Sequence, residues 1–242
     1  MRGRLTHLFG LACACVAFSA STSRARVYQR TGGLPEASDL FRRGGGKIAY
    51  ASDMILNGGD ARLTVGAFNR PLAEVAAELR RRLDLSDSLL QSASFGRSRI
   101  SAPDGVLRLV LFSVGGDNPS LVVAIEQTAA EAEASQTPPK RHALKAVPAY
   151  PDSRPRFFAH NHDTGLSLAV ADTQAAPEAV QSFFATQLSR GGWTALPPSN
   201  ATRAGGVRVY SRGSDLVCTH VAPSSKRTGQ TVTILHKKPG VR

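Results

Sequence analysis

Cysteine, tryptophan and acidic side chains are scarce in this sequence. Its 242 residues hold three cysteines, one tryptophan and 18 acidic residues, and aromatic residues make up 6% of the chain. So few aromatic rings argue against the stacking surface on which proteins bind single-stranded nucleic acid. We therefore do not expect nucleic acid as a partner.

Sequence motifs of common enzyme classes are missing as well. The chain has no G-x-S-x-G and no H-E-x-x-H, and the Gly-Lys in "RRGGGKIAY" (42–50) is not followed by the Ser or Thr of a phosphate loop. No two acidic residues have a spacing that points to acid–base catalysis. These absences predict a protein without a cofactor and favour a non-catalytic role.

The N-terminus has the composition of an export signal. A basic start, "MRGR", precedes the apolar run "LFGLACACVAFSA" (8–20), which is too short to span a bilayer. Small residues at Ser23 and Ala25 predict cleavage after Ala25 and a periplasmic or secreted protein. Cys218 would then be the single cysteine, so no internal disulfide could form. The alternative is a lipoprotein acylated at Cys13 or Cys15.

Two stretches of the chain resemble each other. They are "NGGDARLTVGAFNRPLAEVAAELRRRL" (57–83) and "HDTGLSLAVADTQAAPEAVQSFFATQL" (162–188). Each has a polar turn, an alternating strand, a proline-containing link and an amphipathic helix. The aligned apolar pairs are Leu63 with Leu168, Val75 with Val180, Leu79 with Phe184 and Leu83 with Leu188.

Strand-like segments follow each helix, at 97–103, 106–114 and 121–128 and again at 206–212, 215–223 and 231–238. The pattern predicts an α+β fold made of two tandem repeats, each a curved antiparallel sheet with one amphipathic helix packed on it. A chance resemblance is the alternative. The predicted organisation is a signal peptide over 1–25, an irregular leader over 26–46, the first repeat over 47–128, a linker rich in Ala, Pro and charge over 129–152, and the second repeat over 153–242.

Histidine and cysteine offer two candidate sites. His160 and His162 have a spacing that a metal could use, but the repeat places His162 in a hairpin turn equivalent to Asn57-Gly58. Cys218, His220 and His236 could form a nucleophile–base pair or a metal site. The alignment puts these three opposite Leu109, Leu111 and Glu126, so a structural role is the competing interpretation.

Positive charge is the strongest compositional feature. The formal net charge is +12, and Lys140, Arg141 and Lys145 cluster in the predicted linker. An exported basic protein meets anionic lipid, cell-wall polymer or another envelope protein, and we expect the partner to be of this kind. The competing interpretation is a merely solvated basic surface.

One segment carries a resemblance. Pro148, Tyr150 and Pro151, then Val180, Phe183 and Phe184, then Gly192 and Trp193 form a P-x-Y-P … V-x-x-F-[YF] … G-W pattern. The pattern resembles that of uncharacterised exported bacterial proteins and covers only the second half of the chain. It implies an envelope or secreted protein and no known activity. The sequence therefore favours a non-catalytic binding module. The alternative is a small exported hydrolase or metal-dependent enzyme that uses His160 and His162, or Cys218, His220 and His236.

Overall fold

The computed structural model describes residues 27–29, 33–92, 94–113, 119–139, 144–197, 207–224 and 229–238. Within these residues the chain forms two compact units. The first contains the described residues up to 54 and 59–136, and the second contains those from 137 onward together with 55–58. The predicted signal peptide, 1–25, lies outside the described residues.

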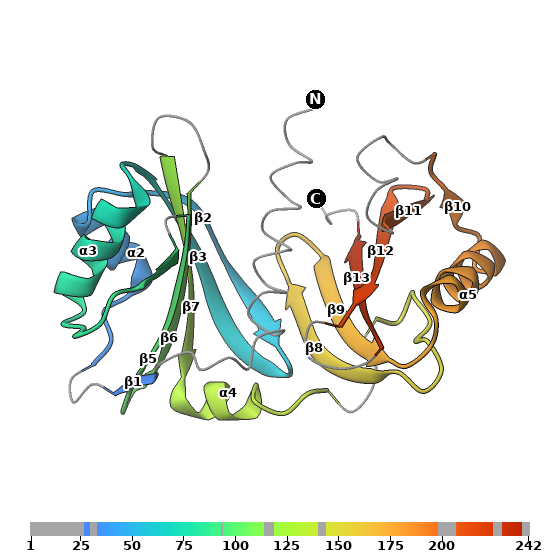
Figure 1. The fold of residues 1–242 in the computed structure, drawn as a ribbon, viewed down its shortest axis with the longest axis horizontal. Helices are drawn as coiled ribbons and strands as arrows, with labels where there is room; N and C mark the ends of the chain where they lie inside the picture. Colours follow the sequence, from blue (N-terminus) through green and yellow to red (C-terminus); the bar gives the residue numbers. More distant parts are fainter. Residues whose placement is uncertain are drawn as a thin grey trace. The chain divides into compact units, whose positions relative to one another are not determined.

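An antiparallel sheet forms the body of the first unit (Figure 1). Its strands run in the order β5-β6-β7-β3-β2, with β1 parallel to β5 and β4 antiparallel to β5. The elements are β1 (Val27–Gln29), α2 (Ala37–Arg43), β2 (Lys47–Leu56), β3 (Gly59–Asn69), α3 (Leu72–Arg82), β4 (Leu90–Ser92), β5 (Phe95–Ala102), β6 (Gly105–Ser113), β7 (Pro119–Thr128) and α4 (Ala129–Ala134).

Helices α2 and α3 cover one face of this sheet (Figure 1). On α3, the predicted stripe of Val75, Leu79 and the following Leu83 is at most 1% exposed. Beneath it lie buried side chains that alternate along the strands: Ile100, Leu107, Leu109, Leu111, Val122 and Ala124. Burial of each Val, Leu or Ile side chain in this contact contributes about 1.5–3 kcal/mol, which holds the helix on the sheet.

The described part of the segment predicted as an irregular leader, 26–46, contains a short strand, β1, and a helix, α2. Helix α2 buries Leu40 and Phe41, and the Phe41 ring meets Phe68 edge-on with the ring centres 5.8 Å apart. The Glu126 carboxylate of β7 accepts a hydrogen bond of 2.8 Å from the Ala37 N–H at the start of the helix. A helix of seven residues is too short to be stable alone. These tertiary contacts are therefore what order it, and the local sequence signal is weak.

Antiparallel strands also form the body of the second unit, in the order β8-β9-β13-β12-β11-β10. Helix α5 lies against it, and Val180, Phe184 and Leu188 of the helix are at most 1% exposed (Figure 1). The elements are β8 (Arg154–Asn161), β9 (Leu166–Thr173), α5 (Pro177–Arg190), β10 (Thr194–Ala195), β11 (Val207–Arg212), β12 (Asp215–Pro223) and β13 (Gln230–Lys237). The sheet residues packed with the helix are Ala169, Tyr210, Val217, Val221, Val232 and Ile234.

The segment predicted as a linker, 129–152, is largely built into the two units. Thr128 and Glu131 form a reciprocal capping box that starts α4 directly after β7. Leu144 and Val147 are 6% and 2% exposed and belong to the core under α5. The linker prediction therefore overlooked two apolar residues that the second unit buries.

Both units pack helices against antiparallel strands, so the chain has the predicted α+β fold. Among the residues that the structure describes, no helix has the length and apolarity needed to cross a bilayer.

Candidate functional site

His160 and His162 lie at the hairpin between β8 and β9. The turn is closed by Asn161, whose side-chain oxygen accepts hydrogen bonds from the Thr164 N–H (2.9 Å) and hydroxyl (2.8 Å). Gly165 has a φ of +62°, a left-handed conformation that glycine adopts without strain. The polar residues of this stretch therefore have a structural use as turn formers.

The two imidazole rings are neighbours, with their centres 5.0 Å apart. His160 Nδ1 also lies 2.9 Å from the Ser167 hydroxyl. Burial, and then the nearby His162 and Lys238, lower the pKa of His160. Within the described part of the chain, no group of three or more His, Cys, Asp or Glu side chains is arranged to hold a metal. The pair therefore offers two ligands of the four that a structural zinc site uses.

Cys218, His220 and His236 do not converge. In the β12–β13 ladder, His236 is opposite Val217, whereas Cys218 is opposite Leu235 and His220 is opposite Thr233. Directly opposed residues share a face of the sheet. Val217 lies in the core beneath α5, so His236 is on that face and the other two side chains are on the reverse. The nucleophile–base or metal group that the spacing suggested is not assembled.

His236 is part of a buried cluster behind α5. It is 2% exposed, and its ring lies 5.9 Å from that of Trp193. Its Nε2 is 3.9 Å from the nearer Asp215 oxygen, which is too long for a hydrogen bond. The Arg212 guanidinium stacks 4.5 Å above the Trp193 ring and lies 3.7 Å from Asp215. Burial lowers the pKa of His236 although Asp215 acts in the opposite sense, so the imidazole is neutral near pH 7.

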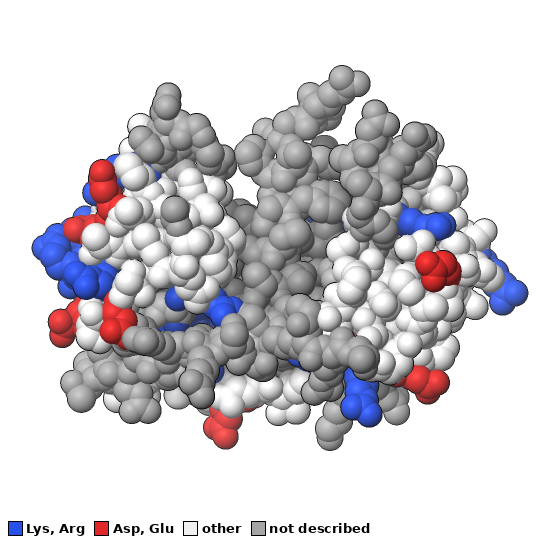
Figure 2. All heavy atoms as spheres, in the orientation of Figure 1, with Lys and Arg blue, Asp and Glu red and all other residues white. Residues whose placement is uncertain are grey.

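The predicted basic cluster is only partly visible. Lys145 is exposed next to the buried Leu144, and Lys140 and Arg141 lie outside the described residues. On the face that Figure 2 shows, positive and negative side chains lie side by side over α2 and α3. Neither the described part of the linker nor this face of the first unit is therefore assigned a patch of a single charge sign.

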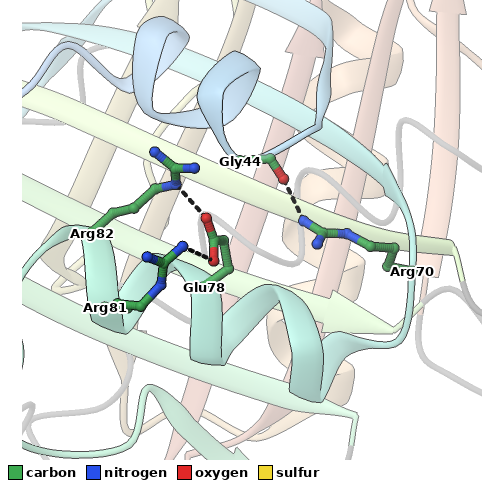
Figure 3. A network of polar contacts seen from close by, with 5 residues as sticks. All are labelled: Gly44, Arg70, Glu78, Arg81 and Arg82. Atoms are coloured by element: carbon green, nitrogen blue, oxygen red, sulfur yellow. Dashed lines mark hydrogen bonds and ion pairs between the residues drawn. The ribbon is translucent and has the colours of Figure 1, made fainter.

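Glu78 offsets part of the positive charge of the arginines at the end of α3 (Figure 3). Glu78 accepts hydrogen bonds from Arg81 (2.7 Å) and Arg82 (2.5 Å), and the bond from Arg81 is the largest cause that lowers the pKa of Glu78. Arg70 donates to the Gly44 carbonyl at the end of α2. One carboxylate thus contacts two guanidinium groups of the same helix, and the separate Arg70 bond ties the segment before α3 to the end of α2.

A different pair of arginines was missed by the sequence reasoning. Arg99 on β5 and Arg108 on β6 are directly opposite each other, and both are half-buried. Their neighbours along the strands, Ile100 and Leu107, lie in the core under α3, so the two arginines face away from the helices. Arg108 donates to the side-chain oxygen of Gln127, and the Arg99 Nε is buried without a hydrogen-bond partner among the described residues.

Burial, and then the charge of Arg99, lower the pKa of Arg108 to about 10. No carboxylate of the described residues lies within 4.0 Å of either guanidinium group. Two like charges therefore share a partly desolvated position without a counter-ion from the described chain. The sequence contained the signal, an arginine in the middle of an apolar strand, but not the pairing that makes it informative.

Comparison of the whole chain with protein-family models, with curated proteins and with solved structures gives no match, so the assignment of a function must rest on the geometry of these groups.

Proposed function

We propose that the protein is an exported, non-catalytic binding module whose first unit binds an anionic partner through Arg99 and Arg108. The observation that carries the proposal is the cross-strand pairing of these two arginines. Like charges directly opposite each other destabilise a sheet, and burial adds a desolvation cost. A bound phosphate or carboxylate would remove both costs, and guanidinium groups bind such anions with two parallel hydrogen bonds.

The distribution of acidic residues supports an external anion. Of the 18 acidic side chains, only Asp117 lies outside the described residues. The other acidic side chains do not lie within ion-pair distance of Arg99 or Arg108. With a net charge of +12, the chain has a surplus of cations that its own carboxylates do not offset.

The non-catalytic part of the proposal is supported by the positions of the histidines and the cysteine. His160 and His162 serve a hairpin, and His236 is on the opposite face of its sheet from Cys218 and His220. A base, a nucleophile and an orienting acid within hydrogen-bond reach of one another would favour the enzyme alternative. These groups do not form such a set.

The binding test uses vesicles of phosphatidylcholine with and without phosphatidylglycerol, and soluble polyphosphate as a lipid-free source of the same anionic group. We expect binding to at least one anionic probe, weakening as salt is raised because exposed charges are screened over about 10 Å at 0.1 M. The Arg99→Gln/Arg108→Gln variant should lose most of it. An Arg42→Gln/Arg43→Gln variant removes the same charge from exposed positions on α2 and should lose much less.

Two results would count against the proposal. One is equal loss of binding in both double variants, which would indicate general attraction to a basic surface. The other is tighter binding by an Asp117→Asn variant, which would identify Asp117 as an internal counter-ion. Because repulsion is relieved, Arg99→Gln/Arg108→Gln should also gain about 0.2–1 kcal/mol of stability. Export is tested separately, by N-terminal sequencing of the protein from its native envelope, with Arg26 as the expected first residue.

We also infer that the two units are tandem copies. The orders β2-β3-β7-β6-β5 and β8-β9-β13-β12-β11 are the same when each is counted along the chain. The helix residues Val75, Leu79 and Leu83 are buried, as are Val180, Phe184 and Leu188 at the aligned positions. An experimental structure should superpose Leu63 on Leu168 and Leu79 on Phe184. Strand orders that differ there would make the likeness a coincidence.

A further inference from the structure

One carboxylate in the second unit lies between two basic side chains. The Oδ2 atom of Asp215 on β12 is 3.7 Å from Nη2 of Arg212 on β11 and 3.9 Å from Nε2 of His236 on β13. Both distances are longer than a hydrogen bond. This oxygen therefore forms a hydrogen bond with neither side chain, and a small movement would bring it to one or to the other.

The His236 ring is built to respond to a proton. It is 2% exposed, and its Nε2 atom is buried without a hydrogen-bond partner among the described residues. A protonated imidazole carries an N–H on both ring nitrogens, and a buried donor without an acceptor is costly. The Asp215 oxygen would satisfy it by moving about 1 Å, which gives the 2.7–2.9 Å of a charge-assisted hydrogen bond.

Arg212 connects this carboxylate to the end of α5. Its Nη1 donates a 3.1 Å hydrogen bond to the carbonyl of Gly191, the residue that ends the helix. Its guanidinium group also stacks 4.5 Å above the ring of Trp193. Because the attraction of Asp215 helps to hold the guanidinium in this position, a carboxylate that turns toward His236 weakens both contacts.

The other groups around His236 leave Asp215 as its acidic partner. Lys238, which follows β13, is a cation and opposes a second positive charge, as Arg212 does. On β9, Ser167 is opposite His236 in the sheet register, and its hydroxyl lies 2.9 Å from Nδ1 of His160 on β8. The residues that α5 buries over this face are the apolar Val180, Phe184 and Leu188.

We propose that His236, Asp215 and Arg212 form an acid-sensitive latch at the C-terminal end of α5. A proton taken up from water by His236 draws the Asp215 carboxylate to Nε2, and Arg212 then releases Trp193 and the Gly191 carbonyl. Loss of the proton restores the first arrangement.

The release belongs to mildly acidic conditions. Burial lowers the pKa of His236 from its ordinary value of 6.5, so the imidazole takes up its proton below that pH. The latch lies in the second unit and does not involve Arg99 or Arg108, so it does not rest on the proposed anion binding.

The fluorescence of Trp193, the single tryptophan, reports the state of the latch in the full chain. The ring of His236 lies 5.9 Å from that of Trp193, and a protonated imidazole quenches indole emission. We expect the emission to fall between about pH 7 and pH 5.5. His236→Phe keeps an aromatic ring but cannot take up a proton, so its emission should stay constant. The matched control is His220→Gln, on the other face of the sheet, which should behave like the parent chain.

Hydrogen exchange at the end of α5 separates release of the latch from titration of the histidine alone. The N–H groups of residues 191–193 donate to carbonyls in the last turn of the helix. After correction for the intrinsic pH dependence of exchange, their protection should fall about fivefold on acidification, the effect of losing one hydrogen bond. Arg212→Gln should show the lower protection already at neutral pH and lose no more in acid.

The proposal is overturned if Trp193 emission stays constant in the parent chain, or falls equally in His236→Phe that is folded by far-UV circular dichroism. It is also overturned if protection at residues 191–193 stays constant, or falls no more than in the β12–β13 ladder, which would indicate a loss of stability of the whole unit. Asp215→Asn keeps the histidine and removes the carboxylate. A loss of protection in acid that persists in this variant counts against the latch as well.

Discussion

Replacing Phe184 with alanine should destabilise the second unit strongly. The side chain is 1% exposed and lies in the centre of the core between α5 and the sheet. It also meets Phe183 edge-on, with the ring centres 5.3 Å apart. Removing a buried phenylalanine ring costs about 3–5 kcal/mol, because the buried apolar surface is lost and the cavity left behind destabilises the fold further. With a urea slope of about 2 kcal/mol/M, the unfolding midpoint should fall by about 1.5–2.5 M.

The single tryptophan of the chain makes this measurement specific to the second unit. Trp193 is 4% exposed in the same core as Phe184, so its fluorescence reports the unfolding of this unit. Thr186→Ala changes an exposed position of the same helix and should shift stability by no more than about 0.5 kcal/mol. If Phe184→Ala behaves like this control, the packing of α5 on the sheet described above is wrong.

Three further expectations concern other parts of the chain. Gly66→Ala should cost about 1–3 kcal/mol by overpacking, measured by urea unfolding, because a Cβ there would come within 2.6 Å of the Phe41 ring. Burial lowers the pKa of His236 from its ordinary value of 6.5, so as the pH falls the unfolded chain takes up this proton before the folded chain does. The free energy of unfolding should therefore decrease as the pH falls below about 6.5. His236→Leu should flatten that dependence in unfolding measurements at about pH 7 and 5.5, and an unchanged slope would contradict it. His160→Ala/His162→Ala should leave the metal content unchanged by elemental analysis, whereas loss of a stoichiometric metal would revive the enzyme alternative.

Helices on the face of a sheet were the part of the fold most accessible to sequence reasoning. Val75 and Leu79, like Val180 and Phe184, recur at the spacing of one helical face, and the structure buries all four. Helix α2 gave a weaker signal because its order depends on contacts made by Phe41 with distant strands. The spacing of apolar residues along the sequence reports a local helical preference, and it gives no signal for a helix that tertiary contacts stabilise.

The register of the strands could not be predicted from the sequence. The alignment placed Cys218 opposite Leu109, but Leu109 lies in the core under α3, whereas Cys218 is on the face of its sheet away from α5. A shift of one residue moves every side chain to the other face. The run "VLRLVLFSV" is apolar on both faces, with Val110 and Leu109 both buried, so alternation could not fix the register.

Strand register also explains why the structure brings together other residues than those the sequence suggested as a site. Arg99 and Arg108 become a pair only when β5 and β6 are aligned, and their local sequence does not predict that alignment. The residue types showed that these side chains carry charge, but their neighbours were set by the long-range pairing of the strands.

The strand order of each unit also determines when its sheet can close. The last strand made, β7 or β13, lies between two strands that precede it in the chain. Until β13 leaves the ribosome, the β8–β9 hairpin and the β11–β12 hairpin have no strand to join them, and isolated hairpins are marginal in water. The pairing of β13 with β9 spans helix α5 and three strands, β10, β11 and β12, which makes closure slow as well as late. The sheet of each unit can therefore be completed only after the last strand of that unit has been synthesised.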